Sequence, residues 1–240
     1  MLQYHLNKAG GLMFKVLLWD LDNTLLDFNL AQRNSLKHVF ERFSLGECSE
    51  DVLEKFAEIN ARHWQMLEKG EITKKALGKS RFKELLNYCG KAGMANPIEM
   101  DREFENGICH TISFIDDSHN LLNRLKRDYA LYCITNGDKN VQRQRIKVAM
   151  FNNIFRDLFI SEEIKYDKPS KEFFDYALKK IIPCEKDEIL VIGDSLSSDM
   201  RGANNASLKC CWYNPNGIPQ PNDLRIDYEI KELSEIKNIL

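Results

Sequence analysis

The sequence contains no long hydrophobic run and no cysteines at CxxC spacing. No apolar stretch approaches the ~20 residues of a transmembrane helix, and residues 1–13 hold only scattered apolar positions, unlike an export signal. The seven cysteines lack CxxC spacing, which argues against both a zinc site and a disulfide framework. We therefore expect a cytoplasmic protein with reduced cysteines and no membrane partner.

The sequence also lacks a strong excess of either charge. Its 34 Lys and Arg residues nearly balance 36 Asp and Glu residues, for a formal net charge of -2. No global field therefore attracts a nucleic acid polymer, and we expect none as a partner. Local basic clusters such as residues 143–145 (RQR) and 179–180 (KK) are interpreted as solvated helix faces.

What the sequence does contain is an alternation of apolar runs and helical patterns. Residues 15–19 (KVLLW) are typical of a parallel strand that is covered on both faces. From residue 30 to about residue 110, apolar positions recur at helical spacing and no strand interrupts them. Further strands then alternate with helices, and we expect them at residues 129–134, 158–160, 188–192 and 209–213.

This order predicts an α/β fold. A doubly wound parallel sheet, Rossmann-like in topology, would carry an inserted all-helical cap domain. We assign residues 14–28 and 112–240 to the core and residues 29–111 to the cap. Residues 1–13 are interpreted as an N-terminal extension, either disordered or the product of an upstream start codon.

Polar clusters follow directly after the predicted strands. They are residues 20–24 (DLDNT), 135–137 (TNG) and 193–195 (GDS), and Lys168 follows the strand at 158–160. Because ligands bind at the carboxyl ends of the strands in open parallel sheets, these clusters should meet in one crevice. Each cluster alone is typical of a turn or a helix cap, but that explanation does not account for all of them in this order.

The aspartates of these clusters would repel one another unless a cation lay among them. Those concerned are Asp20, Asp22, Asp194 and Asp199. Mg²⁺ prefers oxygen ligands and contacts one or two carboxylates plus a substrate phosphate. The ammonium group of Lys168 could neutralise further charge. The combination predicts phosphoryl transfer, in which positioning and charge stabilisation supply most of the catalysis.

These residues resemble the four motifs of the haloacid dehalogenase superfamily, and within it the phosphatases. Residues 20–24 match the first motif, DxDx[TV], and Thr135 matches the second. Lys168 matches the third motif, and Gly193 and Asp194 with Asp199 match the fourth. The resemblance covers residues 15 to about 216, and the helical insert stands where that family has its mobile cap.

The resemblance implies a role for each matched residue. It makes Asp20 the nucleophile and Asp22 the general acid and then the general base. It implies Mg²⁺ as cofactor, held by Asp20, the backbone carbonyl of Asp22, and Asp194, while Asp199 orients metal-bound water or Lys168. The residues implied to hold the phosphate oxygens are Thr135, Asn136 and Lys168.

A closer resemblance points to the bacterial pyrimidine 5′-nucleotidases. It rests on residues 25–36, 70–86, 134–145, 204–217 and 228–233. It implies a nucleoside 5′-monophosphatase with a pyrimidine preference, whose substrate is a small phosphomonoester. The cap should decide the substrate. Candidate contacts, none of which is assigned to the site, are Asn29, Arg33, His63, Trp64 and Arg81.

Three alternatives remain open. The same core could serve a small-metabolite phosphatase that acts on phosphoglycolate or a sugar phosphate. A 2-haloacid dehalogenase is less favoured because, as the resemblance has it, dehalogenases lack the second aspartate that Asp22 supplies. A regulator without activity would have no need of the four charged groups Asp20, Asp22, Lys168 and Asp194.

Overall fold

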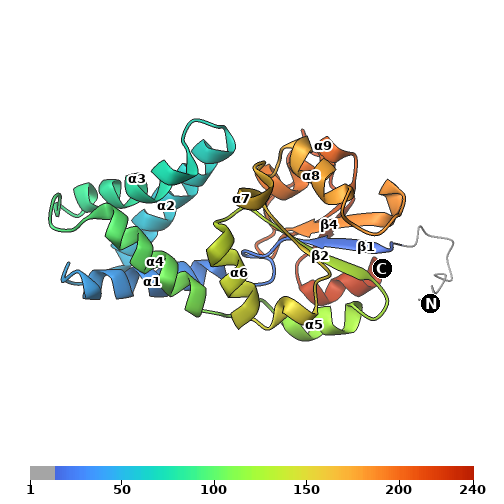
Figure 1. Ribbon diagram of the computed structural model, residues 1–240, viewed down its shortest axis with the longest axis horizontal. Coiled ribbons are helices and arrows are strands. Elements are labelled where there is room, and N and C mark those ends of the chain that lie inside the picture. Colours follow the sequence, from blue (N-terminus) through green and yellow to red (C-terminus); the bar gives the residue numbers. More distant parts are fainter. Residues whose placement is uncertain (1–13) are drawn as a thin grey trace. The chain divides into compact units, whose positions relative to one another are not determined.

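A computed structural model describes residues 14–240 of the chain (Figure 1), so the predicted N-terminal extension lies outside the described residues. The chain forms two compact units. The core unit joins the residues up to Asp27 to Phe114–Leu240, and the cap unit is Phe28–Ser113. The sequence predicted the two boundaries at 28/29 and 111/112.

The core unit is built on a six-stranded sheet with the order β3-β2-β1-β4-β5-β6. Every neighbouring pair is parallel. The strands are β1 (Val16–Trp19), β2 (Ala130–Thr135), β3 (Leu158–Ile160), β4 (Ile189–Gly193), β5 (Lys209–Tyr213) and β6 (Tyr228–Ile230). The predicted doubly wound, Rossmann-like sheet is therefore confirmed.

The strand order places the switch point of the sheet between β1 and β4. From β1 the chain moves outward through β2 and β3, and then returns to the other side of β1 to continue through β4 to β6. Leu17 pairs with Leu131 of β2 on one side and with Leu190 of β4 on the other. A crevice for ligands is expected where the strand order reverses, at the carboxyl ends of β1 and β4.

Helices cover both faces of the sheet (Figure 1). Helices α8 and α9 pack on one face, where Phe173, Phe174 and Ala203 join Leu18 and Val191 in the core. Helix α5 lies on the opposite face in Figure 1. The helices of this unit are α5 (Ser118–Leu125), α6 (Lys139–Val148), α7 (Ser161–Ile164), α8 (Lys171–Leu178) and α9 (Arg201–Ala206).

Burial of β1 on both faces explains its uniformly apolar sequence. All of its residues from Val16 to Trp19 are fully buried, and the next residue, Asp20, continues the pairing by donating its backbone N–H to Ile192 O at 2.8 Å. The polar group is thus fixed at the end of an apolar strand.

Two short elements differ from the prediction. Strand β6 has only three residues, and Glu229 in its middle is exposed, so no apolar run marks it. The helix expected between the strands at 188–192 and 209–213 begins with a π-helical turn, Leu196–Met200, before α9. Ser195 caps that turn by accepting a hydrogen bond from the backbone N–H of Ser198.

The cap unit contains four helices, which agrees with the helical pattern of the sequence. They are α1 (Phe28–Arg42), α2 (Glu50–Glu68), α3 (Lys74–Tyr88) and α4 (Pro97–His110). Their core includes Phe56, Phe82 and Phe104, whose ring centroids lie 5.1 to 5.6 Å apart. Such aromatic clusters bury large apolar areas, so the cap has a hydrophobic core of its own.

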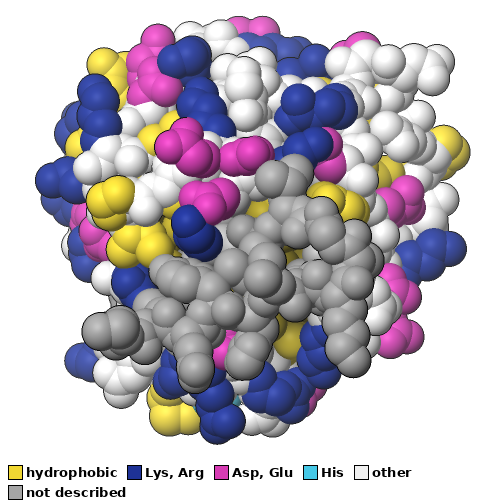
Figure 2. All heavy atoms as spheres, turned by 90° about the vertical axis from the view of Figure 1, so that its right-hand side faces the viewer, with side chains coloured by type: hydrophobic (Ala, Val, Ile, Leu, Met, Phe, Trp, Pro, Cys, Tyr) yellow, Lys and Arg dark blue, Asp and Glu magenta, His cyan; other side chains and the backbone are white. Residues whose placement is uncertain are grey.

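Among residues 14–240, no helix is both long enough and apolar enough to span a bilayer. On the face drawn in Figure 2, Lys and Arg side chains are interspersed with Asp and Glu wherever the atoms are not grey. This visible part of the surface offers no extended area of one charge to a polyanion.

Candidate active site

Lys168 lies at the centre of a buried charge cluster at the carboxyl ends of β1 and β4. Its ammonium group donates to Asp20 Oδ1 and Asp199 Oδ1, both at 2.6 Å, and to Ile134 O at 3.1 Å. All three charged side chains are buried. Burial alone would lower the pKa of Lys168, but the carboxylates of Asp199 and Asp20 outweigh it and raise that pKa, so the lysine stays cationic.

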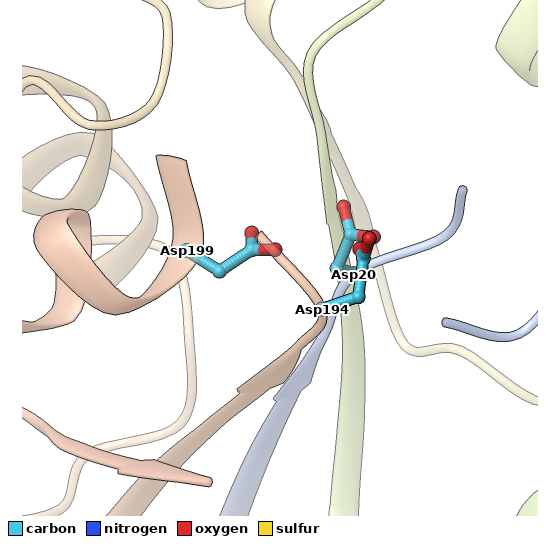
Figure 3. Close-up of side chains that lie close together, drawn as sticks. All are labelled: Asp20, Asp194 and Asp199. Atoms are coloured by element: carbon cyan, nitrogen blue, oxygen red, sulfur yellow. The ribbon is translucent and has the colours of Figure 1, made fainter. Parts of the chain in front are cut away.

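Asp20, Asp194 and Asp199 form a carboxylate cluster. One oxygen from each lies within 4.8 Å of the others, and Figure 3 shows Asp199 pointing from the turn after β4 toward Asp20 and Asp194. Burial and the Asp199 carboxylate raise the pKa of Asp20 well above its ordinary range, although Lys168 opposes this. Burial, with Asp199, raises the pKa of Asp194 to about 7. The cluster is therefore short of positive charge.

A divalent cation bound by these carboxylate oxygens would supply the missing positive charge. Asp199 already uses both of its oxygens, since Oδ1 accepts from Lys168 and Oδ2 accepts from the backbone N–H of Ser195 at 3.1 Å. Asp20 and Asp194 are the carboxylates best placed to hold Mg²⁺. The site's chemistry thus matches the cofactor that the sequence predicted.

Gly193 makes room for Asp199. A Cβ atom at position 193 would lie 2.3 Å from Asp199 Oδ2, well inside van der Waals contact. Any side chain there would displace the carboxylate that holds Lys168. The glycine of the GDS cluster is therefore required by packing.

Two contacts fix the loop that carries Asp194. The Thr24 hydroxyl donates to Asp194 Oδ1 at 3.2 Å, and the indole N–H of Trp212 in β5 donates to the Asp194 backbone carbonyl at 2.9 Å. No role for Trp212 could be predicted from the sequence. A tryptophan at a strand end gives no local sign of such a contact, because its partner lies 18 residues away.

Asp22 is held by two residues of α6. The guanidinium group of Arg145 donates to Asp22 Oδ1. The side-chain amide of Gln142 donates to Asp22 Oδ2 at 2.7 Å and to the Thr135 hydroxyl at 2.6 Å. The predicted acid/base residue and a predicted phosphate-binding residue are therefore linked by one amide.

The interpretation of residues 143–145 as a solvated helix face is wrong for Arg145. Arg143 is exposed and pairs with Glu163, but Arg145 is buried, with 1% of its side chain exposed. The two residues lie on different sides of α6, since a helix turns by about 100° per residue. Arg145 instead shares a face with Gln142, three residues earlier.

Asn136 contacts the backbone of Lys168. Its side-chain amide donates to Lys168 O and accepts from Lys168 N–H, both at 2.8 Å. The side chain therefore fixes the loop that carries Lys168. The predicted contact of Asn136 with a phosphate stays a prediction.

Three of the candidate contacts in the cap, Arg33, His63 and Arg81, have other partners within that unit. Arg81 is buried and donates to Asp101 Oδ1 at 2.6 Å and to Asn60 Oδ1 at 2.8 Å, and its guanidinium carbon lies 4.8 Å from the Phe104 ring centroid. The ring of His63 is buried, with Nδ1 2.8 Å from Ile59 O. Arg33 pairs with Glu50 at the surface. These contacts give Arg81 and His63 a structural part in the cap core.

Comparison with known proteins decides the family. The model of the haloacid dehalogenase-like hydrolase family matches residues 17–213, which include every predicted site residue. The chain belongs to this family. The superfamily that the four motifs predicted is thereby confirmed, and so is the prediction that the chain is an enzyme.

Three known proteins resemble the chain over nearly all of its length. The HAD-hydrolase YfnB of Bacillus subtilis is 31% identical and covers 95% of both chains. Its solved structure, bound to magnesium, superposes with a TM-score of 0.89 over 95% of this chain and 99% of that one.

Two further relatives are named as pyrimidine 5′-nucleotidases. PynA of Streptococcus pneumoniae is 30% identical over 95% of this chain and 98% of its own. YjjG of Escherichia coli is 28% identical over 93% of this chain and 96% of its own. The predicted resemblance to this branch is confirmed.

Proposed function

We propose that the protein is a Mg²⁺-dependent phosphomonoester hydrolase that acts through an aspartyl-phosphate on Asp20. The observation that carries this proposal is the buried Lys168, which bridges Asp20 and Asp199 beside Asp194. A structural ion pair needs one partner for each charge. Here one cation binds two carboxylates and a third, Asp194, lies beside them, which suits a site that receives a metal ion and a phosphate.

In the first step, an Asp20 oxygen attacks phosphorus and the bond from phosphorus to the leaving oxygen breaks. The hydrogen bond from Lys168 orients Asp20 by its Oδ1 atom. Asp22 gives a proton to the leaving oxygen, so that an alcohol departs. Mg²⁺ held by Asp20 and Asp194 supplies positive charge to the phosphate oxygens when it is bound.

In the second step, water attacks the phosphorus of the aspartyl-phosphate. Asp22, now ionised, takes a proton from that water, and the bond from phosphorus to Asp20 breaks. Inorganic phosphate leaves and the Asp20 carboxylate is regenerated. Thr135, the Asn136 backbone N–H and Lys168 hold the phosphate oxygens in both steps, and Asp199 keeps Lys168 in place.

The substrate class that we propose is the nucleoside 5′-monophosphates, with a preference for pyrimidines. The support is the similarity to PynA and YjjG, both named as pyrimidine 5′-nucleotidases, over more than nine-tenths of the chain. Small phosphomonoesters of other kinds, such as phosphoglycolate and hexose phosphates, are the alternative that an assay has to exclude.

A phosphate-release screen tests this substrate class. We expect dUMP, dTMP and UMP to be hydrolysed with kcat/KM at least about tenfold above those of phosphoglycolate and hexose phosphates. EDTA should abolish release from every substrate, and added Mg²⁺ should restore it. A reversed ranking would refute the nucleotidase proposal and leave the phosphatase proposal standing. Undiminished release in EDTA would refute the role of Mg²⁺.

A further inference from the structure

Both carboxylate oxygens of Asp22 are bound by side chains from a single helix. Arg145 donates to Oδ1 and Gln142 donates to Oδ2 at 2.7 Å. Arg145 Nη1 also donates to Gln142 Oε1 at 3.2 Å, so the two donors are bonded to each other. Both are buried, whereas a quarter of the Asp22 side chain is exposed.

We propose that Gln142 and Arg145 are positioning residues, which we call the Asp22 clamp, and that they fix the orientation in which Asp22 exchanges its proton with the leaving group and with water. This proposal rests on the proposed function. A short carboxylate side chain can rotate about two bonds. Two donors on its two oxygens select one orientation, and misplacing a reacting group by about 1 Å can cost about 100-fold in rate.

The clamp also couples Asp22 to the phosphate-binding loop. The same Gln142 amide group that binds Asp22 donates to the Thr135 hydroxyl at 2.6 Å. A Cβ atom at position 137 would lie 2.7 Å from Gln142 Cγ, so Gly137 makes room for this side chain. Packing against Gln142 therefore explains the glycine of the TNG cluster. The Gln142 amide group also sets the distance between Asp22 and Thr135.

The start of helix α6 determines where the two clamp residues point. Asp138 caps it by accepting hydrogen bonds from the backbone N–H groups of Asn140 and Val141. The helix therefore starts directly after the TNG cluster. Gln142 and Arg145 lie three residues apart on one face of the helix. Both side chains reach Asp22, which follows β1, and Gln142 also reaches Thr135 at the end of β2. Arg143, on another face, binds Glu163 instead.

The test compares two substrates that differ in their need for a proton. A nucleoside 5′-monophosphate has an alkoxide leaving group that needs protonation, and p-nitrophenyl phosphate has a good leaving group that needs little. We expect Arg145→Lys and Gln142→Met to lower kcat for the nucleotide by about 10- to 100-fold, with KM within about twofold. The loss on p-nitrophenyl phosphate should be at least about fivefold smaller. Lysine cannot replace the arginine because it lacks the planar fork of donors.

A double-mutant cycle with Asp22→Asn separates positioning from packing. If the clamp acts through Asp22, Arg145→Lys should change kcat by less than about twofold once Asp22→Asn is present. Arg143→Lys, on the exposed side of the same helix, is the matched control and should retain wild-type kinetics. Thermal unfolding verifies that each variant is folded. If Arg145→Lys does not fold, the same cycle is measured with Gln142→Met.

Equal losses on the two substrates, or an undiminished effect of Arg145→Lys beside Asp22→Asn, would overturn the clamp and leave the phosphatase proposal intact. A wild-type protein that releases phosphate from neither substrate would overturn both. A leaving-group-dependent loss that disappears in the Asp22→Asn background would establish Gln142 and Arg145 as positioning residues.

Discussion

Asp20→Asn should leave a folded protein whose phosphate release is reduced by at least about 1,000-fold on every substrate. The amide has almost the same shape as the carboxylate, but it cannot attack phosphorus. Burial and Asp199 disfavour the ionised form of Asp20, as its raised pKa shows. The neutral side chain should therefore keep thermal stability without Mg²⁺ at or above that of the wild type.

Steady-state phosphate release and thermal unfolding together check this result. Asp128→Asn is a suitable control, since Asp128 is an exposed carboxylate of the same unit outside the charge cluster. It should retain wild-type activity. A folded Asp20→Asn protein with activity within about tenfold of the wild type would refute the nucleophile assignment.

Lys168→Met should depress activity on all substrates alike and should also destabilise the core unit. Removing the cation leaves Asp20 and Asp199 buried without their shared partner. Breaking a buried ion pair in this way costs about 3–5 kcal/mol. Lys168→Arg should not rescue the enzyme, because the planar guanidinium group cannot reproduce the three bonds that the compact ammonium group makes in this buried site.

Denaturant unfolding in EDTA measures the free energy of unfolding of Lys168→Met and of the control Lys171→Met. Lys171 is more than half exposed, and its pair with Asp175 is a surface pair, so its loss should cost less than about 1 kcal/mol. A Lys168→Met protein as stable as this control would contradict the buried-cation account. A loss of activity confined to one substrate would contradict a role in phosphate binding.

The sheet and the charge cluster at its edge could be predicted because their signals are local. Parallel strands that are buried on both faces are continuous apolar runs, and the polar residue that ends such a run has to lie at the ligand-binding edge of the sheet. Asp20 and Asp194 each follow directly after such a strand, and Thr135 is the last residue of another. Strand β6 was missed because it is a short edge strand with an exposed Glu229 and makes no such run.

The parts that could not be predicted depend on contacts between residues far apart in the sequence. Arg145 is buried because Asp22, 123 residues earlier, provides its partner. Nothing in residues 143–145 distinguishes that arginine from the exposed Arg143. The three-residue spacing from Gln142 was the one available signal, because it places both side chains on the helix face that follows the TNG cluster. The side chain of Asn136 likewise binds the backbone of Lys168, 32 residues away.

The most direct test of the central claim is to trap the phosphorylated enzyme. Asp22→Asn should slow hydrolysis of the intermediate, while p-nitrophenyl phosphate still forms it, because this substrate needs little protonation of its leaving group. Acid quenching followed by peptide mass spectrometry should find one added phosphoryl group on Asp20 when Mg²⁺ is present, and none in EDTA or in the Asp20→Asn protein. Phosphate release at the same enzyme concentration without any phosphorylated Asp20, or with the phosphoryl group on another residue, would contradict the mechanism.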